Sequence, residues 1–396
     1  MLLKSLLQKN SPKPKMMVER VLVLGDGASG LAAVKLAQRQ GMEPTLVCKD
    51  AQLPEGEFSF AVLSPGVPPW HFWFDELRKR SIPYKSELEF GVTNLKKLGW
   101  ELFAVTGSKG KSSVVKLVAD AIGAVPCGNY GLPVSSVEGD SGRAVVEVSS
   151  FMMETTTLPS DTFKAAALIN LQKDHLDRHK TAEVYHELKR KLLSFAIKKI
   201  DATKGESHFK GSAHLYEGSY FDNSVLKVNA ECAVQLMRIA GLDDGAIKAA
   251  FKNFNPLPHR MQIVYEREKV LFIDDSKSTS LESLRAALQM CNGSPIRLIA
   301  GGLDKADDPK DIIFDLTKQV KKVYLIGCCA EKFFAAWSTS VACEKSVTLE
   351  NAVKAAKRDA KPGEVVLLSP GAASYDQFKN FGERGDTFVR LVKQQG

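Results

Sequence analysis

The stretch LFAVTGSKGKSS, residues 102–113, decides the fold of this chain. Its first half is a continuous apolar run, typical of a strand covered on both faces, and its second half is a glycine-rich turn ending in Gly-Lys-Ser. Backbone N–H groups in such a turn converge on an anion at the start of the following helix. The usual phosphate-loop pattern has a glycine where this chain has Val105, but Gly107 and Gly110 preserve the turn. We predict a nucleotide-phosphate site here, with a glycine-rich surface turn as the alternative.

The chain of 396 residues is long enough for two or three domains, and its composition is that of an ordinary globular protein. A net charge of +8 suits anionic substrates such as phosphates and does not by itself indicate nucleic acid. No apolar run in the sequence approaches the length of a membrane span, and the seven cysteines form no Cys-x-x-Cys pair. We expect a cytoplasmic monomer that binds neither nucleic acid nor membrane.

Strand–turn–helix units flank the opening stretch on both sides. Upstream, VERVLVLG (residues 18–25) leads into a glycine-rich turn and a helix, which is the opening of a βαβ unit. Downstream, AVVEVSS (144–150) and AALIN (166–170) are further buried strands of a parallel sheet. A helix is expected from residue 181 to about 199. Residues 200–228 are weakly patterned and are expected to form loop with short antiparallel strands.

The last third of the chain alternates again between strands and helices, with strands at VLFID, IRLIAGG, KKVYLIG and EVVLLSP. Two prolines in NFNPLPHR mark a linker before it. The pattern therefore predicts an α/β protein of three domains. After a basic lead at 1–17, we expect an N-terminal domain at 18–97, a central domain at 98–256 and a C-terminal domain at 257–396.

Polar residues follow the strands of the central domain where each strand ends, which is where parallel α/β sheets bind ligands. Lys111 would neutralise the β- and γ-phosphates, and Ser112 would offer its hydroxyl to Mg²⁺. Glu147 interrupts an apolar strand, and a half-buried carboxylate needs a metal or hydrogen-bond donors. His175, in DHLDRH, is either a metal or phosphate ligand or part of a loop whose charges pair among themselves. Lys189 alone would be interpreted as a surface lysine.

The first glycine-rich turn, GDGASG at residues 25–30, fits the dinucleotide fingerprint, but the next strand ends in Cys48-Lys49 instead of an acidic residue. An NAD oxidoreductase is therefore a weaker hypothesis than a tight, close-packed turn. In the C-terminal domain, DDSKST, GGLDK and SPGAASY follow three strands. Their cationic and hydroxyl groups would form a rim suited to a small dicarboxylate or a triphosphate, with ordinary loop polarity as the alternative.

Seven motifs in this order together resemble the Mur ligases: VTGSKGKSS, VVEVSSFMME, NLQKDHLDRH, LPHRMQIV, DDSKST, GGLDK and SPGAASYDQFKNFGERG. The resemblance is collinear and covers nearly the whole chain from residue 18. The last motif is similar to that of the D-glutamate-adding members. The resemblance implies a Rossmann-like domain for a UDP moiety, a central P-loop ATPase domain and a C-terminal Rossmann-like domain for an amino acid. It implies ATP-dependent addition of D-glutamate to UDP-N-acetylmuramoyl-L-alanine through an acyl phosphate, in peptidoglycan precursor synthesis, with ATP and two Mg²⁺ ions.

The resemblance also implies roles for individual residues. The catalytic residues would be Lys111, Glu147, His175 and Lys189. The ATP contacts would be Gly107, Ser108, Lys109, Gly110, Lys111, Ser112, Ser113, Asn229, Arg260, Asp275 and Lys277. The UDP-substrate contacts would be Ala28, Ser29, Ser64, Gly66, Asn129 and His175. The D-glutamate contacts would be Thr279, Lys305, Ser374, Tyr375 and Phe381. The metal ligands would be Ser112, Glu147, His175 and a carbamylated Lys189, because addition of CO₂ turns an ammonium group into an anionic oxygen ligand.

The chain departs from the family pattern at three places that concern nucleotides. Lys109 stands where Asn is usual, Val225-Leu226 replaces a His-Asn pair expected shortly before Asn229, and Lys49-Asp50 replaces a polar-basic uracil contact. We therefore predict intact phosphate and D-glutamate chemistry with altered nucleotide affinity. The alternatives are another ligase of the superfamily, of the folylpolyglutamate synthase type, and a catalytically silent nucleotide-binding homologue.

Overall fold

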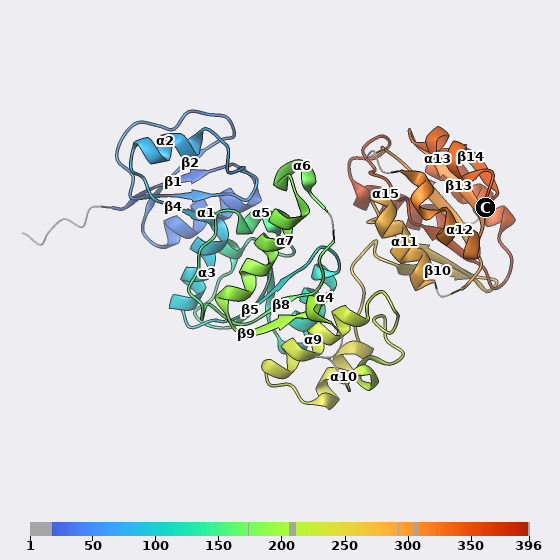
Figure 1. Cartoon of the computed structure of the whole chain (residues 1–396), viewed down its shortest axis with the longest axis horizontal. Helices are drawn as coiled ribbons and strands as arrows, with labels where there is room; N and C mark the ends of the chain where they lie inside the picture. Colours follow the sequence, from blue (N-terminus) through green and yellow to red (C-terminus); the bar gives the residue numbers. More distant parts are fainter. Residues whose placement is uncertain (1–17, 173, 206–210, 292, 305–307, 395–396) are drawn as a thin grey trace, which may run out of the picture. The chain divides into compact units, whose positions relative to one another are not determined.

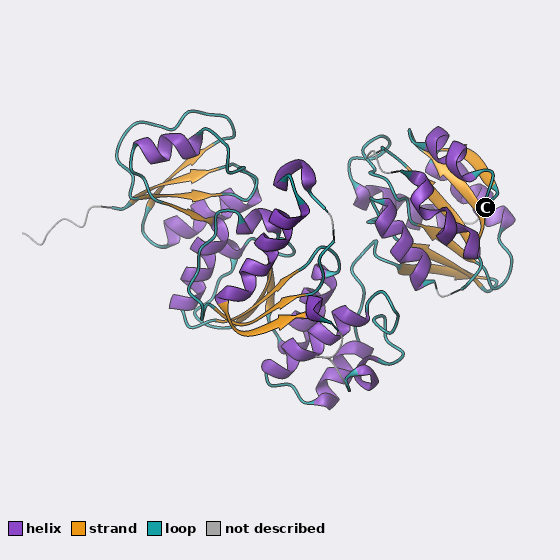
Figure 2. Ribbon diagram, in the orientation of Figure 1, coloured by secondary structure: helices purple, strands orange, loops and turns teal. Residues whose placement is uncertain are grey.

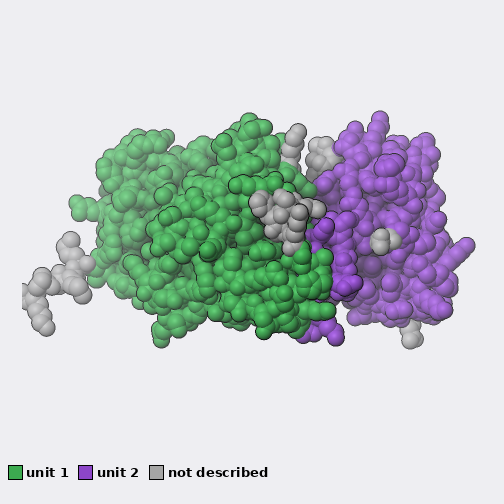
Figure 3. Space-filling model, turned by 60° about the horizontal axis from the view of Figure 1, so that its bottom comes forward, with its two compact units in different colours: residues 1–215, 228–250 green, residues 216–227, 251–396 purple. Residues whose placement is uncertain are grey.

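The computed structural model describes residues 18–172, 174–205, 211–291, 293–304 and 308–394 (Figure 1). These residues form three mainly parallel sheets with helices packed against them (Figure 2). The chain divides into two compact units, residues 1–215 with 228–250 and residues 216–227 with 251–396 (Figure 3). Within the described part, no helix has the length and apolar character needed to cross a membrane.

The N-terminal sheet is parallel and has the strand order β2-β1-β3-β4. Along β1, Val21 and Val23 pack into one apolar cluster and Leu22 and Leu24 into another, because both faces of the sheet are covered. The parallel pairing of β1 with β2 across α1 confirms the prediction that VERVLVLG opens a βαβ unit. The elements are β1 (Arg20–Leu24), α1 (Ala28–Arg39), β2 (Glu43–Val47), β3 (Phe60–Leu63), α2 (Trp73–Lys79), β4 (Tyr84–Ser86) and α3 (Glu87–Lys97).

The central sheet is parallel and has the order β6-β7-β5-β8-β9, so the strand that precedes the glycine-rich turn lies in the middle. Its elements are β5 (Glu101–Thr106), α4 (Lys111–Ile122), β6 (Val125–Gly128), β7 (Arg143–Glu147), α5 (Ser150–Met153), β8 (Phe163–Leu168), α6 (Leu176–His179), α7 (Ala182–Lys191), β9 (Ala196–Asp201), α8 (Ala213–Tyr216), α9 (Lys227–Ile239) and α10 (Asp244–Lys252).

Two expectations for this region are wrong. The helix expected to reach about residue 199 ends at Lys191, and after the 3₁₀ turn Leu192–Phe195 the chain enters β9. β9 is an edge strand with an exposed Ile-Lys-Lys segment at 197–199, so it lacks the apolar run of an inner strand. In the described residues between 202 and 226 there are no antiparallel strands, only turns and short helices such as α8.

The C-terminal sheet has the order β10-β11-β15-β12-β13-β14, and β10 alone runs antiparallel to its neighbour. Both of its faces are covered by apolar clusters. Its elements are β10 (Gln262–Arg267), β11 (Val270–Asp274), α11 (Leu281–Met290), β12 (Ile296–Gly301), α12 (Ile313–Gln319), β13 (Val320–Ile326), α13 (Ala330–Trp337), β14 (Cys343–Val347), α14 (Leu349–Asp359), β15 (Val365–Leu368) and α15 (Phe381–Lys393).

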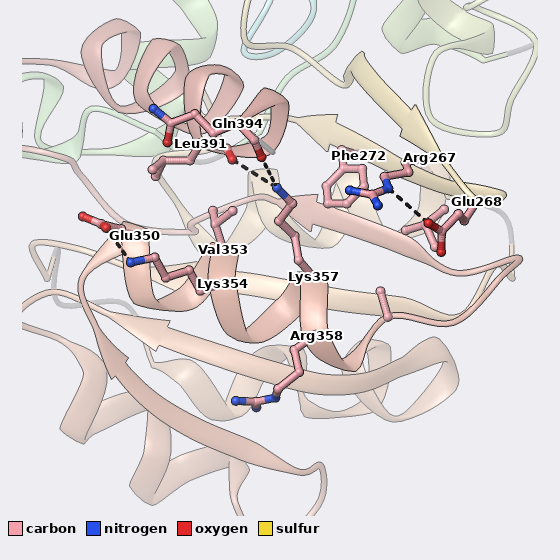
Figure 4. Close-up of a pocket in the computed structure, with 12 residues that line it drawn as sticks. Arg267, Glu268, Phe272, Glu350, Val353, Lys354, Lys357, Arg358, Leu391 and Gln394 are labelled. Atoms are coloured by element: carbon pink, nitrogen blue, oxygen red, sulfur yellow. Dashed lines mark hydrogen bonds and ion pairs between the residues drawn. The ribbon is translucent and has the colours of Figure 1, made fainter. Parts of the chain in front are cut away.

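Lys357 joins α14 to the end of α15, beside a pocket of about 440 Å³ (Figure 4). Its Nζ donates to the carbonyl oxygens of Gln394 over 2.8 Å and of Leu391 over 3.4 Å, where the negative end of the helix dipole favours a cation. Other charges at the pocket are paired as well, since Lys354 lies 2.7 Å from Glu350. None of the predicted site residues lines this pocket, so the predicted chemistry lies elsewhere.

Candidate active site

The glycine-rich turn at residues 107–110 joins β5 to α4 and is held in shape by Asn170, which follows β8. Asn170 Oδ1 accepts hydrogen bonds from the backbone N–H groups of Ser108 (3.0 Å) and Lys109 (2.9 Å), and its Nδ2 donates to the Lys109 carbonyl. α4 begins without a side-chain cap, after Gly110 at φ 80°. A twelve-residue helix that starts in this way directs its first N–H groups at an anion. The geometry fits the predicted phosphate loop.

Asn229, on α9, packs directly against this loop. A Cβ atom on Gly110 would lie 1.9 Å from Asn229 Nδ2, so any other residue at position 110 would clash with that side chain. The positive φ of Gly110 imposes the same choice. The predicted ATP contact Asn229 therefore lies at the glycine-rich turn, although it follows Gly110 by 119 residues in the chain.

Two lysines meet at the loop. Lys111 Nζ donates to the Gly107 carbonyl over 2.9 Å and to the Ser108 carbonyl over 3.4 Å. Lys189, on α7, is buried and also donates to the Gly107 carbonyl over 2.9 Å. Burial, followed by the charge of Lys111, lowers the pKa of Lys189 to about 7, and the nearby carboxylates only partly oppose this. The surface-lysine interpretation of Lys189 is wrong, because the apolar edge of α7 faces inward at this position.

Glu147 ends β7 beside the loop and is buried. Its Oε1 accepts a hydrogen bond of 2.7 Å from Asn129 Nδ2, whereas its Oε2 is buried and has no hydrogen-bond partner among the described residues. A buried carboxylate oxygen in this state is costly unless a cation or donor is supplied. This oxygen of Glu147 is therefore available to bind a cation.

His175 precedes α6 as its N-cap residue, in the left-handed region at φ 51°, and its side chain is about half exposed. Its ring lies 5.0 Å from that of Phe151 and 6.1 Å from that of Tyr185, measured between ring centroids. Tyr185, which the sequence did not single out, donates through its hydroxyl to Ser108 Oγ over 3.2 Å, and Lys189 Nζ lies 4.5 Å from its ring centroid. No group of three His, Cys, Asp or Glu side chains able to hold a metal occurs among the described residues.

A pocket of about 610 Å³ opens beside these residues, within the same compact unit. Five of the six residues predicted to contact the UDP substrate line it, and His175 is the one that does not. The five are Ala28, Ser29, Ser64, Gly66 and Asn129. Lys49, which stands where a uracil contact is expected, lines it too, and so do Ser149 and Phe151, which the sequence did not indicate as binding residues.

The first glycine-rich turn forms one wall of this pocket. A Cβ on Gly30 would lie 1.7 Å from the Gly25 carbonyl oxygen, so the turn requires glycine there. Ser64 Oγ donates to the same carbonyl over 3.2 Å and fixes the loop after β3 against the turn. The N-terminus of α1, capped by no side chain, therefore faces the pocket with its N–H groups, as an anion site does.

The C-terminal unit gathers most of its predicted residues at the ends of β11 and β15. Asp275 is buried; burial raises its pKa to about 7, although hydrogen bonds from the Ser369 hydroxyl (2.8 Å) and the Met261 N–H oppose the shift. Lys277 Nζ lies 3.9 Å from the ring centroid of Phe381. Ser374 is buried and Tyr375 is exposed in the loop after β15.

Three further predicted residues belong to this unit: Thr279, Arg260 and Lys305. The loop after β11, which carries Thr279, is tied to the loop after β15 by a hydrogen bond of 3.0 Å from the Gly371 N–H to the Ser278 carbonyl. The charge of Arg260 acts on Asp275. Lys305 lies outside the described residues.

Models of two protein families match the chain. The Mur ligase middle domain matches residues 105–202, and the Mur ligase glutamate ligase domain matches residues 259–371. Among curated proteins, the UDP-N-acetylmuramoylalanine–D-glutamate ligase of Chlamydia caviae is 30% identical, over 94% of this chain and 97% of its own length. The enzyme of the same name from Aquifex aeolicus is 32% identical, over 94% of this chain and 98% of its own.

Solved structures agree at the level of the fold. The UDP-N-acetylmuramate-alanine ligase MurC of Thermotoga maritima superposes with a TM-score of 0.59 at 16% identity, covering 95% of this chain and 99% of its own. MurF ligase of the same organism, solved in complex with ADP, has a TM-score of 0.59 at 16% identity and covers 95% of each chain. The two family models and the curated relatives show that the chain belongs to the Mur ligase family.

Proposed function

We propose that this protein is an ATP-dependent amide ligase that adds D-glutamate to UDP-N-acetylmuramoyl-L-alanine, releasing ADP and phosphate. The observation that carries the proposal is the Asn129–Glu147 pair. Asn129 lines the large pocket, and its amide donates over 2.7 Å to the carboxylate that lies beside the phosphate loop. This hydrogen bond shows that the wall of the substrate pocket lies next to a carboxylate beside the phosphate loop. Such proximity is needed for the γ-phosphoryl group of ATP to reach the substrate carboxylate.

The chemistry follows from the weakness of a carboxylate as an acylating agent. An oxygen of the alanyl carboxylate attacks the γ-phosphorus of ATP, and the bond to the β–γ bridging oxygen breaks to release ADP. The D-glutamate amine then adds to the acyl phosphate carbon, loses a proton, and expels inorganic phosphate as the amide forms. Lys111 would stabilise the charge that develops on the transferred phosphoryl group, and the loop N–H groups would orient it.

The residues at the loop fit magnesium. Glu147 Oε2 is buried without a hydrogen-bond partner among the described residues, and Mg²⁺ is commonly held by one or two carboxylates together with substrate phosphates. Ser112 and Glu147 would hold one ion, and His175 with a carbamylated Lys189 would hold a second. When bound, the ions would neutralise charge on the phosphates during transfer.

Lys189 is suited to carbamylation because its pKa of about 7 leaves a large neutral fraction near pH 7. The neutral amine attacks CO₂, forms an N–C bond and releases one proton, giving an anionic carbamate. Its partner at the Gly107 carbonyl, Lys111, would then face an anion instead of a second cation. The modification would therefore remove the repulsion that the unmodified pair experiences.

For the C-terminal unit, we assign D-glutamate binding to Thr279, Lys305, Ser374, Tyr375 and Phe381, and the remaining ATP contacts to Arg260, Asp275 and Lys277. The hydrogen bond between the loops after β11 and β15 supports this assignment, because it places these two segments together at the carboxyl edge of the sheet. Lys49 lines the pocket where a uracil contact is usual, which supports altered nucleotide affinity.

The proposal is tested by phosphate release from ATP in the presence of UDP-N-acetylmuramoyl-L-alanine, with D-glutamate, L-glutamate and other amino acids compared. We expect release that depends on both the UDP substrate and D-glutamate. Binding of both nucleotides without any amino-acid-dependent release would instead identify a silent homologue.

A further inference from the structure

Arg178, three residues after His175, contacts both Glu154 and a loop that lies more than a hundred residues before it in the chain. On the central sheet's side its Nε lies 3.1 Å from both carboxylate oxygens of Glu154, and Nη2 donates to Oε2 as well. On the other side its guanidinium donates to three successive carbonyl oxygens of the loop after β3, those of Pro65 (3.2 Å), Gly66 (3.3 Å) and Val67 (3.2 Å). Both parts belong to one compact unit.

The contact between Arg178 and Glu154 is largely shielded from water. The guanidinium carbon of Arg178 lies 4.3 Å from the ring centroid of Phe151 and 5.7 Å from that of Trp70, and the arginine side chain is 12% exposed. Glu154 is 5% exposed. Charge-assisted hydrogen bonds strengthen in such surroundings, and only a planar guanidinium can bind a carboxylate side-on while it stacks on aromatic rings.

The loop that Arg178 holds is the one that lines the substrate pocket. Ser64, Pro65, Gly66 and Val67 are all lining residues, so the direction in which their carbonyl groups point sets the shape of that wall. α6, which carries Arg178, follows His175, and its C-terminal end is fixed because His179 is buried against Glu154 (3.3 Å) and Ser150 Oγ (2.9 Å). Glu154 therefore anchors the helix and, through Arg178, the loop.

We propose that Arg178 is a positioning residue that couples the substrate loop Ser64–Val67 to α6, so that the UDP-substrate pocket is formed only when this arginine is in place. The inference rests on the proposed function for the identity of the ligand. It assigns Arg178 no contact with a reacting atom. Loss of the hydrogen bonds made by the Arg178 guanidinium should therefore weaken binding of the UDP substrate. ATP should bind as before, because the phosphate loop at residues 107–110 is held by Asn170.

The test measures the affinity for UDP-N-acetylmuramoyl-L-alanine and for ATP by calorimetry, and KM and kcat for both, in Arg178→Lys and Trp70→Ala variants of the full chain. Lys180→Gln is the matched control, because Lys180 also lies beside the Trp70 ring (5.6 Å) but donates to Asp177 within its own segment. We expect Arg178→Lys to bind the UDP substrate about tenfold or more weakly, the effect of losing one or two charge-assisted hydrogen bonds. Its KM for ATP should be unchanged and its kcat lowered less than its UDP-substrate KM is raised.

Trp70→Ala leaves every hydrogen bond of Arg178 in place and should weaken the same affinity by a smaller factor, whereas Lys180→Gln should behave as the unmodified protein. An unchanged UDP-substrate affinity in Arg178→Lys would overturn the inference, and so would an equal loss of ATP affinity. If the unmodified protein binds both nucleotides without turnover, the proposed function fails, while the affinity comparison still decides the role of Arg178.

Discussion

Lys111 and Lys189 donate hydrogen bonds to the same acceptor, the carbonyl oxygen of Gly107, and each bond is 2.9 Å long. Two cations at one carbonyl repel each other, and this repulsion adds to burial in lowering the pKa of Lys189. The arrangement becomes favourable when polyanionic phosphate is bound or when Lys189 carries a carbamate. The pair therefore gives the proposed phosphoryl chemistry support that is independent of the Asn129–Glu147 contact.

Replacement of Lys111 by alanine should lower ligation about 10²–10³-fold, the usual cost of removing a group that stabilises transition-state charge. The measurement is D-glutamate-dependent phosphate release. Lys109→Asn, which changes a neighbouring loop lysine to the residue usual in the family, is the control and should retain most of the activity. Equal losses in the two variants would mean that the loop acts through its overall charge and not through Lys111.

Activity should rise as the pH increases through about 7, because Lys189 reacts with CO₂ only as the neutral amine. At a fixed pH near 7, added bicarbonate should increase the rate, and it should have no effect on Lys189→Met. A bicarbonate response that persists in Lys189→Met would show that another group is responsible.

The same lysine has a predictable effect on stability. The folded-state pKa of Lys189 lies below the unfolded value of 10.5. Its favourable contribution to the free energy of unfolding is therefore complete above pH 10.5 and is lost as the pH falls through about 7. The melting temperature of Lys189→Met should therefore rise relative to that of the unmodified protein as the pH is lowered from 9 to 6. A constant difference in melting temperature over this range would contradict the low pKa.

Glu147→Gln should retain the fold, because glutamine can still accept the hydrogen bond from Asn129 and no longer buries a charge. It should shift the Mg²⁺ titration of activity to higher concentrations and lower the rate at saturation by about tenfold or more. An unaltered Mg²⁺ dependence would remove Glu147 from the set of metal ligands.

Asp275 gives a stability prediction of opposite sign in the C-terminal unit. Its folded-state pKa is raised from 3.8 to about 7, so its contribution is present below the unfolded value and is lost as the pH rises through about 7. Asp275→Asn keeps an acceptor for the Ser369 hydroxyl and should melt higher than the unmodified protein at pH 8, but not at pH 5. Thermal unfolding at the two pH values measures this.

Much of this molecule could be predicted from the sequence because its inner strands are apolar on both faces. The runs at β1, β5 and β7 mark the sheets, and the residues that follow them, such as Lys111 and Glu147, necessarily lie at the carboxyl edge. The edge strand β9 escaped prediction because its exposed Ile-Lys-Lys segment carries no such signal.

The contacts that escaped prediction join residues distant in the chain. Arg178 pairs with Glu154 at a separation of 24 residues and with Gly66 at 112, and Tyr185 reaches Ser108 at 77. Each of these side chains is polar in a segment that already looked polar, so nothing local distinguishes it from a solvated neighbour. Only the tertiary arrangement shows that Lys189 and Tyr185 face the loop.

The acyl phosphate pathway is tested most directly by following oxygen from the substrate carboxylate. UDP-N-acetylmuramoyl-L-alanine labelled with ¹⁸O in its alanyl carboxylate is incubated with ATP, Mg²⁺ and D-glutamate, and the phosphate released is analysed by mass. We expect each phosphate formed to carry one labelled oxygen and one D-glutamate-containing product to appear for each ADP. Phosphate without label, or ADP formed without the amide product, would rule out the acyl phosphate pathway.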